Sequence, residues 1–148
     1  MVTKKQVYDA FKILNSIKLN SFNKEQKILL INFLRELRNT SNAYEEDIKF
    51  TESKLKPENF DEDYQKAIQY EKAIKDKTEL PITEEEYEDF KKKYIQFQSE
   101  FIAAMKEEDS KEIEIKSDGI TTDMLSDIMT ENNLTVDQYF TIENIISL

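Results

Sequence analysis

The fold is decided by an uninterrupted stretch, residues 24–56, which reads KEQKILLINFLRELRNTSNAYEEDIKFTESKLK. It runs thirty-three residues without a glycine or a proline, and Pro57 ends it. Apolar or small side chains recur in it at alternating spacings of four and three residues, which is the pattern of a long helix with one buried seam. The seam consists of Leu30, Leu34, Leu37, Ser41, Tyr44, Ile48, Thr51 and Leu55.

The first two turns of this helix are apolar on nearly every side. Ile28, Leu29, Ile31 and Phe33 add to the seam there, so we expect this end to be enclosed in a globular core. Further along, the apolar stripe narrows to the seam alone. The pattern therefore predicts a helix that is rooted in a core and projects as one arm of a hairpin.

A second long helix is predicted over residues 84–108. Thr83 at the N-cap and Glu86 three residues later form a capping box, and Ile82 with Tyr87 forms a hydrophobic staple. The seam that follows is aromatic at five consecutive positions: Tyr87, Phe90, Tyr94, Phe97 and Phe101. We expect 84–108 to lie antiparallel to 24–56, with Phe97 facing Leu34 near the root and the end of 24–56 meeting the start of 84–108 at a tip.

The remaining segments are assigned around this hairpin. Residues 57–83 form the tip and contain a shorter helix, about Asp61–Lys75, capped by Asn59 or Asp61. Residues 1–19 contain a helix that folds back on the root, and 109–148 add a strand-like segment and two short helices. The predicted fold is mostly α and a single domain over 1–148. It is a long antiparallel helical hairpin with N- and C-terminal helices packed at its root and at most one short β element.

Composition excludes most enzyme classes. The chain has no cysteine, no histidine and one glycine, so thiolate chemistry, a Ser-His-Asp triad and a glycine-rich phosphate loop are absent. The usual zinc and haem ligands are missing as well. The acidic turn Glu84–Asp89 could hold a metal or act in acid–base catalysis, but its capping role explains it. We expect no catalytic residue, no cofactor and no metal.

The charge indicates what kind of partner to expect. The net charge is −10, with +4 on residues 1–57 and −14 on residues 58–148. Nucleic-acid binding needs a basic patch, and a membrane span needs a long apolar run, and the sequence offers neither. The acidic region is either a solvated helical surface or a surface aimed at a basic partner. We expect a protein partner, and the sequence leaves a homo-oligomer open.

Two groups of residues are candidate contacts for that partner. Phe60, Tyr64 and Tyr70 lie in the tip segment, where less core is available to bury them, with local packing as the alternative. Glu85, Glu88 and Asp89 lie on the second long helix and are candidates for an acidic contact. The aromatic seam from Tyr87 to Phe101 could line an apolar pocket, although helical spacing is also typical of a core.

The N-terminal run QVYDAFKILNSIKL at residues 6–19 resembles the opening of a family of small uncharacterised tailed-phage proteins (domain of unknown function 1617). The Glu-rich start of the second helix at 85–90 and the acidic EIEI at 112–115 also resemble that family, whereas Ala103–Lys106 departs from its Glu-Val repeat. The resemblance implies a phage protein that binds other proteins, in the host cytoplasm or in the virion. Two versions follow: a virion accessory or assembly component, or a small acidic anti-defence inhibitor, similar to anti-CRISPR proteins, that mimics nucleic acid in a basic groove.

Overall fold

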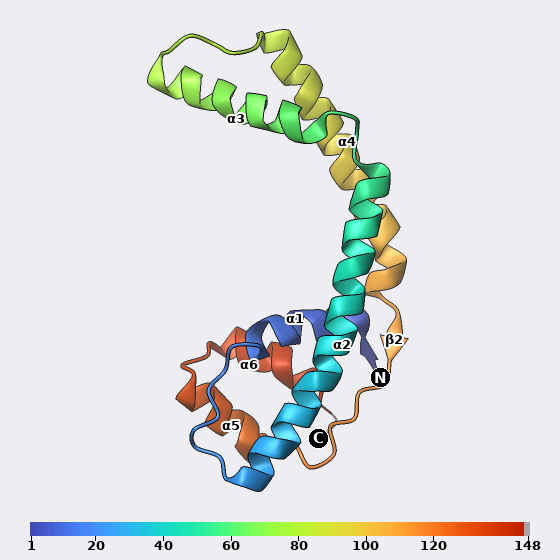
Figure 1. Cartoon of the computed structure of the whole chain (residues 1–148), viewed down its shortest axis with the longest axis vertical. Coiled ribbons are helices and arrows are strands. Elements are labelled where there is room, and N and C mark those ends of the chain that lie inside the picture. The colour runs from blue at the N-terminus through green and yellow to red at the C-terminus, as the bar shows by residue number, and fades with distance from the viewer. Residues whose placement is uncertain (147–148) are drawn as a thin grey trace. The chain divides into compact units, whose positions relative to one another are not determined.

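The computed structural model of the chain describes residues 1–146, and within them it contains six helices and one two-stranded sheet (Figure 1). The helices are α1 (Lys4–Leu14), α2 (Lys24–Leu55), α3 (Phe60–Asp76), α4 (Glu84–Asp109), α5 (Thr122–Glu131) and α6 (Val136–Glu143). The strands are β1 (Val2–Thr3) and β2 (Glu112–Ile113). The mostly α fold class with one short β element, predicted from the sequence, is confirmed.

The chain divides into two compact units where the sequence predicts a single domain. The first unit contains Met1–Ile48 and the part of the chain from Lys106 on, and the second contains Lys49–Met105. The division therefore falls inside α2 and inside α4.

Helix starts follow the capping signals of the sequence. Four helices begin with a reciprocal pair in which a side chain accepts from a backbone N–H three residues on, and the N-cap N–H donates back. These pairs are Thr3–Gln6, Asn23–Gln26, Thr83–Glu86 and Thr135–Gln138. Of the two residues expected to cap α3, Asn59 occupies the N-cap position, but with a φ of 58° and without a side-chain hydrogen bond to the helix, and Asp61 lies inside the helix.

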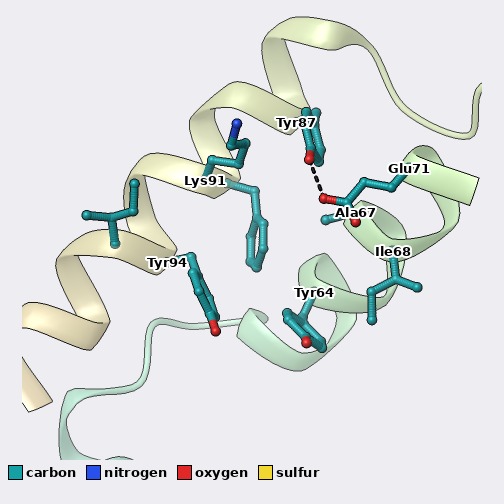
Figure 2. Close-up of a pocket in the computed structure, with 9 residues that line it drawn as sticks. Tyr64, Ala67, Ile68, Glu71, Tyr87, Lys91 and Tyr94 are labelled. Carbon is teal, nitrogen blue, oxygen red and sulfur yellow. Dashed lines mark hydrogen bonds between the residues drawn. The ribbon is translucent and has the colours of Figure 1, made fainter. Parts of the chain in front are cut away.

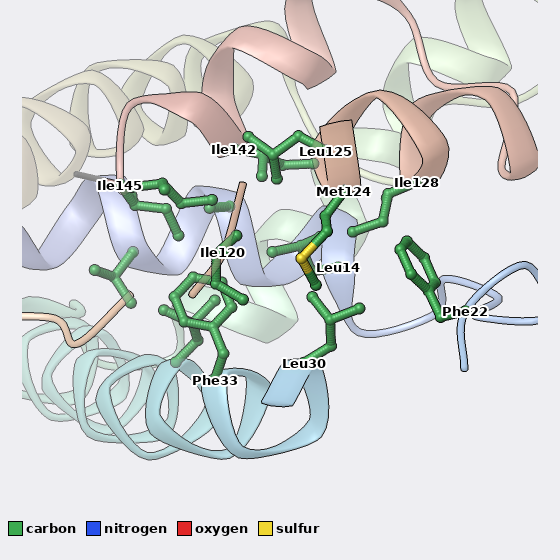
Figure 3. Packing of buried hydrophobic residues seen from close by; sticks show 14 residues of the cluster. Leu14, Phe22, Leu30, Phe33, Ile120, Met124, Leu125, Ile128, Ile142 and Ile145 are labelled. Carbon is green, nitrogen blue, oxygen red and sulfur yellow. The ribbon is translucent and has the colours of Figure 1, made fainter. Parts of the chain in front are cut away.

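The core of the first unit lies where α1, α5 and α6 pack against the N-terminal half of α2 (Figure 3). Val7, Leu37, Ile128 and Ile142 are almost fully buried there. The terminal helices are therefore packed at the root of α2, as predicted. The expectation that the first turns of α2 are enclosed on every side is only partly right, because two of their apolar side chains stay open to solvent. These are Ile28 and Ile31, which are 51% and 41% exposed.

The two strands join the N-terminus to the segment that follows α4. Val2 pairs with Ile113 and Thr3 with Glu112 in antiparallel register, and the Lys4 N–H donates to the Lys111 carbonyl at 2.9 Å. The alternation around Ile113 predicts β2. Nothing in residues 1–5 predicts β1, because a two-residue strand is too short to show a period.

The predicted register of the two long helices is wrong. In the first unit, Tyr44 of α2 donates a hydrogen bond to Asp109, the last residue of α4, so the end of α4 lies beside the middle of α2. In the second unit, Phe97 packs against Phe60 of α3, whereas Leu34 packs into the core of the first unit. The helix that covers the aromatic seam of α4 is thus α3, which supplies aromatic rings that the predicted pairing assigned to an exposed tip.

Candidate functional site

The candidate site lies on the second unit, where α3 packs against α4. The buried stripe of α3 consists of Phe60, Ala67, Tyr70 and Ala73. Two of its four members are alanines and two are aromatic. Ile68 and Ile74 also fall at helical spacing, but they lie outside this stripe. They are 42% and 54% exposed, because the stripe runs through positions 67, 70 and 73.

Aromatic rings hold the two helices together. The Phe60 ring lies 5.0 Å from Phe97, 5.5 Å from Phe90 and 6.0 Å from Tyr94, measured between centroids. The Tyr64 ring lies 6.0 Å from Tyr94 and tilts from it by 24°. Ring pairs at these distances stabilise a contact by about 0.5–1.5 kcal/mol beyond the burial of their area. The α3–α4 pair is therefore an aromatic core, and one of its open sides is lined by Tyr64, Ile68 and Ile95.

That open side is an apolar groove, which we call the aromatic groove (Figure 2). Its volume is about 300 Å³, and it is lined by Tyr64, Ala67, Ile68 and Glu71 of α3 and by Tyr87, Phe90, Lys91, Tyr94 and Ile95 of α4. Seven of these nine side chains are apolar or aromatic. A concave, mostly apolar surface with a few polar groups at its edge is typical of a binding site.

The polar edge of the groove is formed by Tyr87, Glu71 and Lys91. The Tyr87 hydroxyl donates a hydrogen bond to the Glu71 carboxylate, as the dashed line in Figure 2 shows. This bond, helped by burial, raises the pKa of Tyr87 to about 12, because ionisation would set a phenolate against a carboxylate. The Tyr70 ring stacks on the Tyr87 ring at 4.4 Å, and the Lys91 ammonium lies 5.4 Å from the centroid of the same ring. The Tyr87 side chain therefore makes three contacts at this edge.

Exposed isoleucines extend the apolar surface beyond the groove. Ile68 and Ile95 line it while remaining 42% and 60% exposed, and Ile102, seven residues after Ile95 on α4, is 69% exposed. Ile95 and Ile102 lie next to the seam of α4 in sequence, but their exposure shows that they do not widen its buried face. Each follows a seam residue directly, so it points about 100° away from the seam. That offset is the signal that could have identified both as surface residues.

The three aromatic residues predicted as contacts differ in their exposure to solvent. Phe60 and Tyr70 are 9% and 5% exposed, so both are core residues and neither is free to touch a partner. The alternative of local packing holds for these two. Tyr64 is 39% exposed and lines the groove, so it is the member of this group that can contact a ligand.

The acidic candidates are exposed but lie outside the aromatic groove. Glu85, Glu88 and Asp89 share one side of α4 at spacings of three and four residues, and within residues 1–146 none of them is in an ion pair. Asp89 lines a separate shallow pocket together with Asp63 and Lys66. Three lysines at 91–93 follow directly, so the acidic surface is short.

Within residues 1–146, no group of three or more acidic, histidine or cysteine side chains is arranged to hold a metal ion. No helix over the same residues is both long enough and apolar enough to cross a membrane. The chain matches no known protein family, no curated protein and no solved structure.

Proposed function

We propose that this chain is a non-catalytic protein-binding module and that the aromatic groove is its contact surface. The observation that carries the proposal is the exposure of Tyr64, Ile68 and Ile95 around a preformed apolar groove. Keeping such side chains in water costs free energy that a partner surface would recover, at about 25 cal/mol for each Å² of apolar area buried. Exposed apolar side chains around a concave surface are a common feature of binding sites.

The occupant that fits is an amphipathic helix of a partner protein. Ile95 and Ile102 are seven residues apart, which places them two turns apart on one side of α4. A partner helix with apolar residues at the same repeat would pack against them and place one apolar side chain in the groove. The groove volume of about 300 Å³ suits one or two such side chains.

The biological setting we propose is a phage virion or its assembly. It rests on the resemblance of residues 6–19 to a tailed-phage family and on the apolar character of the groove, which suits a lasting contact with a repeated structural subunit. The protein would then be made in the host cytoplasm and act as a virion accessory or assembly component.

A second candidate, an acidic inhibitor of a host defence protein, is supported by a different observation. Glu85, Glu88 and Asp89 are exposed on one side of α4, and the chain carries a net charge of −10. Such a surface could occupy a basic groove that normally binds nucleic acid. The lysines at 91–93 interrupt the acidic surface, so we rank this candidate below the virion component.

The proposal is tested by capturing partners from infected cells with the full chain as bait. Three baits are compared: the unchanged chain, the groove variant I68S/I95S and the control variant I74S/L80S. The control removes two exposed apolar side chains of the same unit, 54% and 46% exposed, that do not line the groove. We expect the groove variant to retain about a tenth or less of the captured partner, as for the loss of two interface anchors.

The identity of the captured protein separates the two versions. Capture of a virion protein that is lost with the groove variant and kept with the control variant supports the virion component. Capture of a nucleic-acid-binding host protein supports the acidic inhibitor. Equal capture of the partner by all three baits would show that the aromatic groove is not the contact surface. Sedimentation of the unchanged chain alone would reveal whether a second copy occupies the groove instead.

A further inference from the structure

Both arginines of the chain line one pocket on the first unit. The sequence contains nineteen lysines and two arginines, Arg35 and Arg38. They lie three residues apart on α2 and face a pocket of about 380 Å³ between α1 and α2. All other basic side chains of the chain are lysines. The two residues of the rarer basic type therefore lie together at one pocket.

The rest of this pocket is largely apolar. Its lining consists of Phe11, Leu14, Asn15 and Ile17 from α1 and the turn after it, and Ile31, Leu34, Arg35 and Arg38 from α2. The four residues of α2 are spaced by three and four positions, so they share one side of the helix. The N-terminal part of that side carries the apolar residues Ile31 and Leu34, and the C-terminal part carries the two arginines. Ile31 is 41% exposed, so part of the apolar floor is open to solvent.

The two guanidinium groups are available to a ligand. In the described part of the chain, Arg35 donates one hydrogen bond, at 3.1 Å to the side-chain oxygen of Asn32, and neither arginine is in an ion pair. This is unexpected in a chain with thirty-one acidic residues. Glu36, which lies between them in sequence, instead accepts a hydrogen bond from the backbone N–H of Lys116 at 3.3 Å.

We propose that this pocket binds an amphiphilic anion, a small molecule with an apolar body and one carboxylate or phosphate group. The apolar body would cover Phe11, Ile31 and Leu34, and the anionic group would lie between Arg35 and Arg38. The planar guanidinium donates two parallel hydrogen bonds to an oxyanion, which a lysine ammonium cannot do. A volume of about 380 Å³ is in the range of small-molecule sites.

The overall charge makes this inference specific to the arginine pair. A chain with a net charge of −10 repels anions at long range, so general electrostatic attraction cannot account for anion binding. Binding must therefore depend on the two guanidinium groups and on the apolar floor together. A neutral molecule with the same apolar body cannot pair with the guanidinium groups, and a simple inorganic anion cannot cover the apolar floor.

The test is an NMR titration of the full chain with phenylbutyrate and with phenethyl phosphate, using phenylbutanol and phenylbutylamine as neutral and cationic analogues. We expect at least one anion to shift the backbone amides of Asn15, Ile31 and Leu34 with a dissociation constant of about 1 mM, as for a fragment of this size. The head group that binds more tightly identifies the source of the anion. The neutral and cationic analogues should bind at least about fivefold more weakly.

Three variants decide whether the arginines are responsible. R35Q/R38Q should abolish binding, and R35K/R38K, which keeps the charge, should weaken it about fivefold to tenfold because the paired hydrogen bonds are lost. The control K24Q/K27Q removes two charges at the same spacing on the same helix and should leave binding unchanged. Equal binding of phenylbutanol, unchanged binding by R35Q/R38Q, or an equal loss with K24Q/K27Q would each overturn the proposal. Both arginines are exposed and neither lysine of the control variant is buried. Melting curves should therefore show all three variants folded.

Discussion

The ring of Phe60 lies 5.0 Å from the ring of Phe97 and is tilted from it by 47°, so the first residue of α3 lies on the aromatic seam of α4. This contact makes α3 and α4 a unit with its own small core. Phe60 is 9% exposed and is within 6.2 Å of four other rings, which makes it the central residue of that core.

The first expectation concerns this residue. Phe60→Ala should lower the free energy of unfolding by about 3 kcal/mol or more, because a buried ring leaves a cavity that its neighbours fill incompletely. Phe50→Ala is the matched control, since Phe50 lies in the same unit but is 68% exposed, and its change should stay within about 0.5 kcal/mol. Urea unfolding measures both. Similar losses for the two variants would show that Phe60 does not hold α3 against α4.

A second expectation follows from the edge of the aromatic groove. The pKa of Tyr87 is raised from 10.0 to about 12 by its hydrogen bond to Glu71. A raised pKa in the folded state stabilises the fold fully below pH 10.0 and stops doing so as the pH rises through about 12. The ultraviolet absorbance of tyrosinate, taken as the difference between the unchanged chain and Y87F, should therefore titrate near pH 12.

The control for this titration is Glu71→Gln. It keeps the shape of the side chain but removes the negative charge, so the midpoint of Tyr87 should move down toward its ordinary value. If the midpoint is the same in both backgrounds, the carboxylate is not the cause of the shift and the groove edge is not held by this bond.

A third expectation concerns Lys4, which joins α1 to both long helices. Its ammonium lies 3.1 Å from Asp47 of α2 and 3.2 Å from Glu108 of α4, and its side chain is 19% exposed. Lys4→Met should lower the free energy of unfolding by about 1 kcal/mol at neutral pH. The adjacent Lys5 is the control: its pair with Asp9 is more exposed, so Lys5→Met should cost less.

The pH dependence of this effect has a definite sign. Hydrogen bonds from Lys111 and from Lys4 hold the pKa of Glu108 below its ordinary value of 4.5. A lowered pKa stabilises the fold above that value, and the stabilisation is lost as the pH falls through the pKa of the folded state. The difference between the unchanged chain and Lys4→Met should therefore shrink in acid. A difference that is constant from neutral to acidic pH would argue against the ion pairs.

The local features of the fold could be predicted from the sequence because their causes are local. The capping box of Thr83 and Glu86 needs only four residues, and it forms as predicted. The seam of α2 also holds, since Leu30, Leu37 and Tyr44 are all buried. Each of these features depends on spacing along one helix, which the sequence states directly.

The partner of the aromatic seam could not be predicted in the same way. A periodic stripe shows that one side of a helix is covered, but it does not show which segment covers it. Phe97 could have faced any apolar helix, and it packs in one cluster with Phe60 and Ala67 of α3. The groove exists only because α3 and α4 pack together. The sequence predicts Tyr64 as a contact residue because it lies in the tip segment, but it does not predict Ile68 and Ile95, which line the groove from the two helices.

A fourth expectation concerns the turn before α5. Gly119 has a φ of +84°, and a Cβ atom added to it would lie 3.0 Å from Cδ2 of Leu29. Gly119→Ala should therefore lower the free energy of unfolding by about 1–2 kcal/mol, through backbone strain and through the displaced leucine. In a Leu29→Ala background the contact is gone, so the added cost of the alanine should be smaller. Equal costs in both backgrounds would leave the backbone strain as the only cause.

The last expectation separates the two proposed binding modes once a partner has been captured. If the acidic surface mimics nucleic acid, affinity depends on charge at long range and falls steeply with salt, because screening shortens to about 3 Å at molar ionic strength. Replacing Glu85, Glu88 and Asp89 with lysine should then abolish binding. The fold should survive, since the three side chains are exposed and the capping residues Thr83 and Glu86 are untouched.

If the aromatic groove is the contact surface, the same experiment gives the opposite pattern. Binding should persist in molar salt, because burial of apolar area is not screened, and the lysine variant should bind within a few-fold of the unchanged chain. The I68S/I95S variant should lose about tenfold or more in affinity under the same conditions. We expect this second pattern, because Ile68, Ile95 and Tyr64 surround a preformed apolar groove, whereas the acidic surface ends at three lysines. Binding that is lost at moderate salt and by the lysine variant, but kept by I68S/I95S, would reverse the ranking of the two functions.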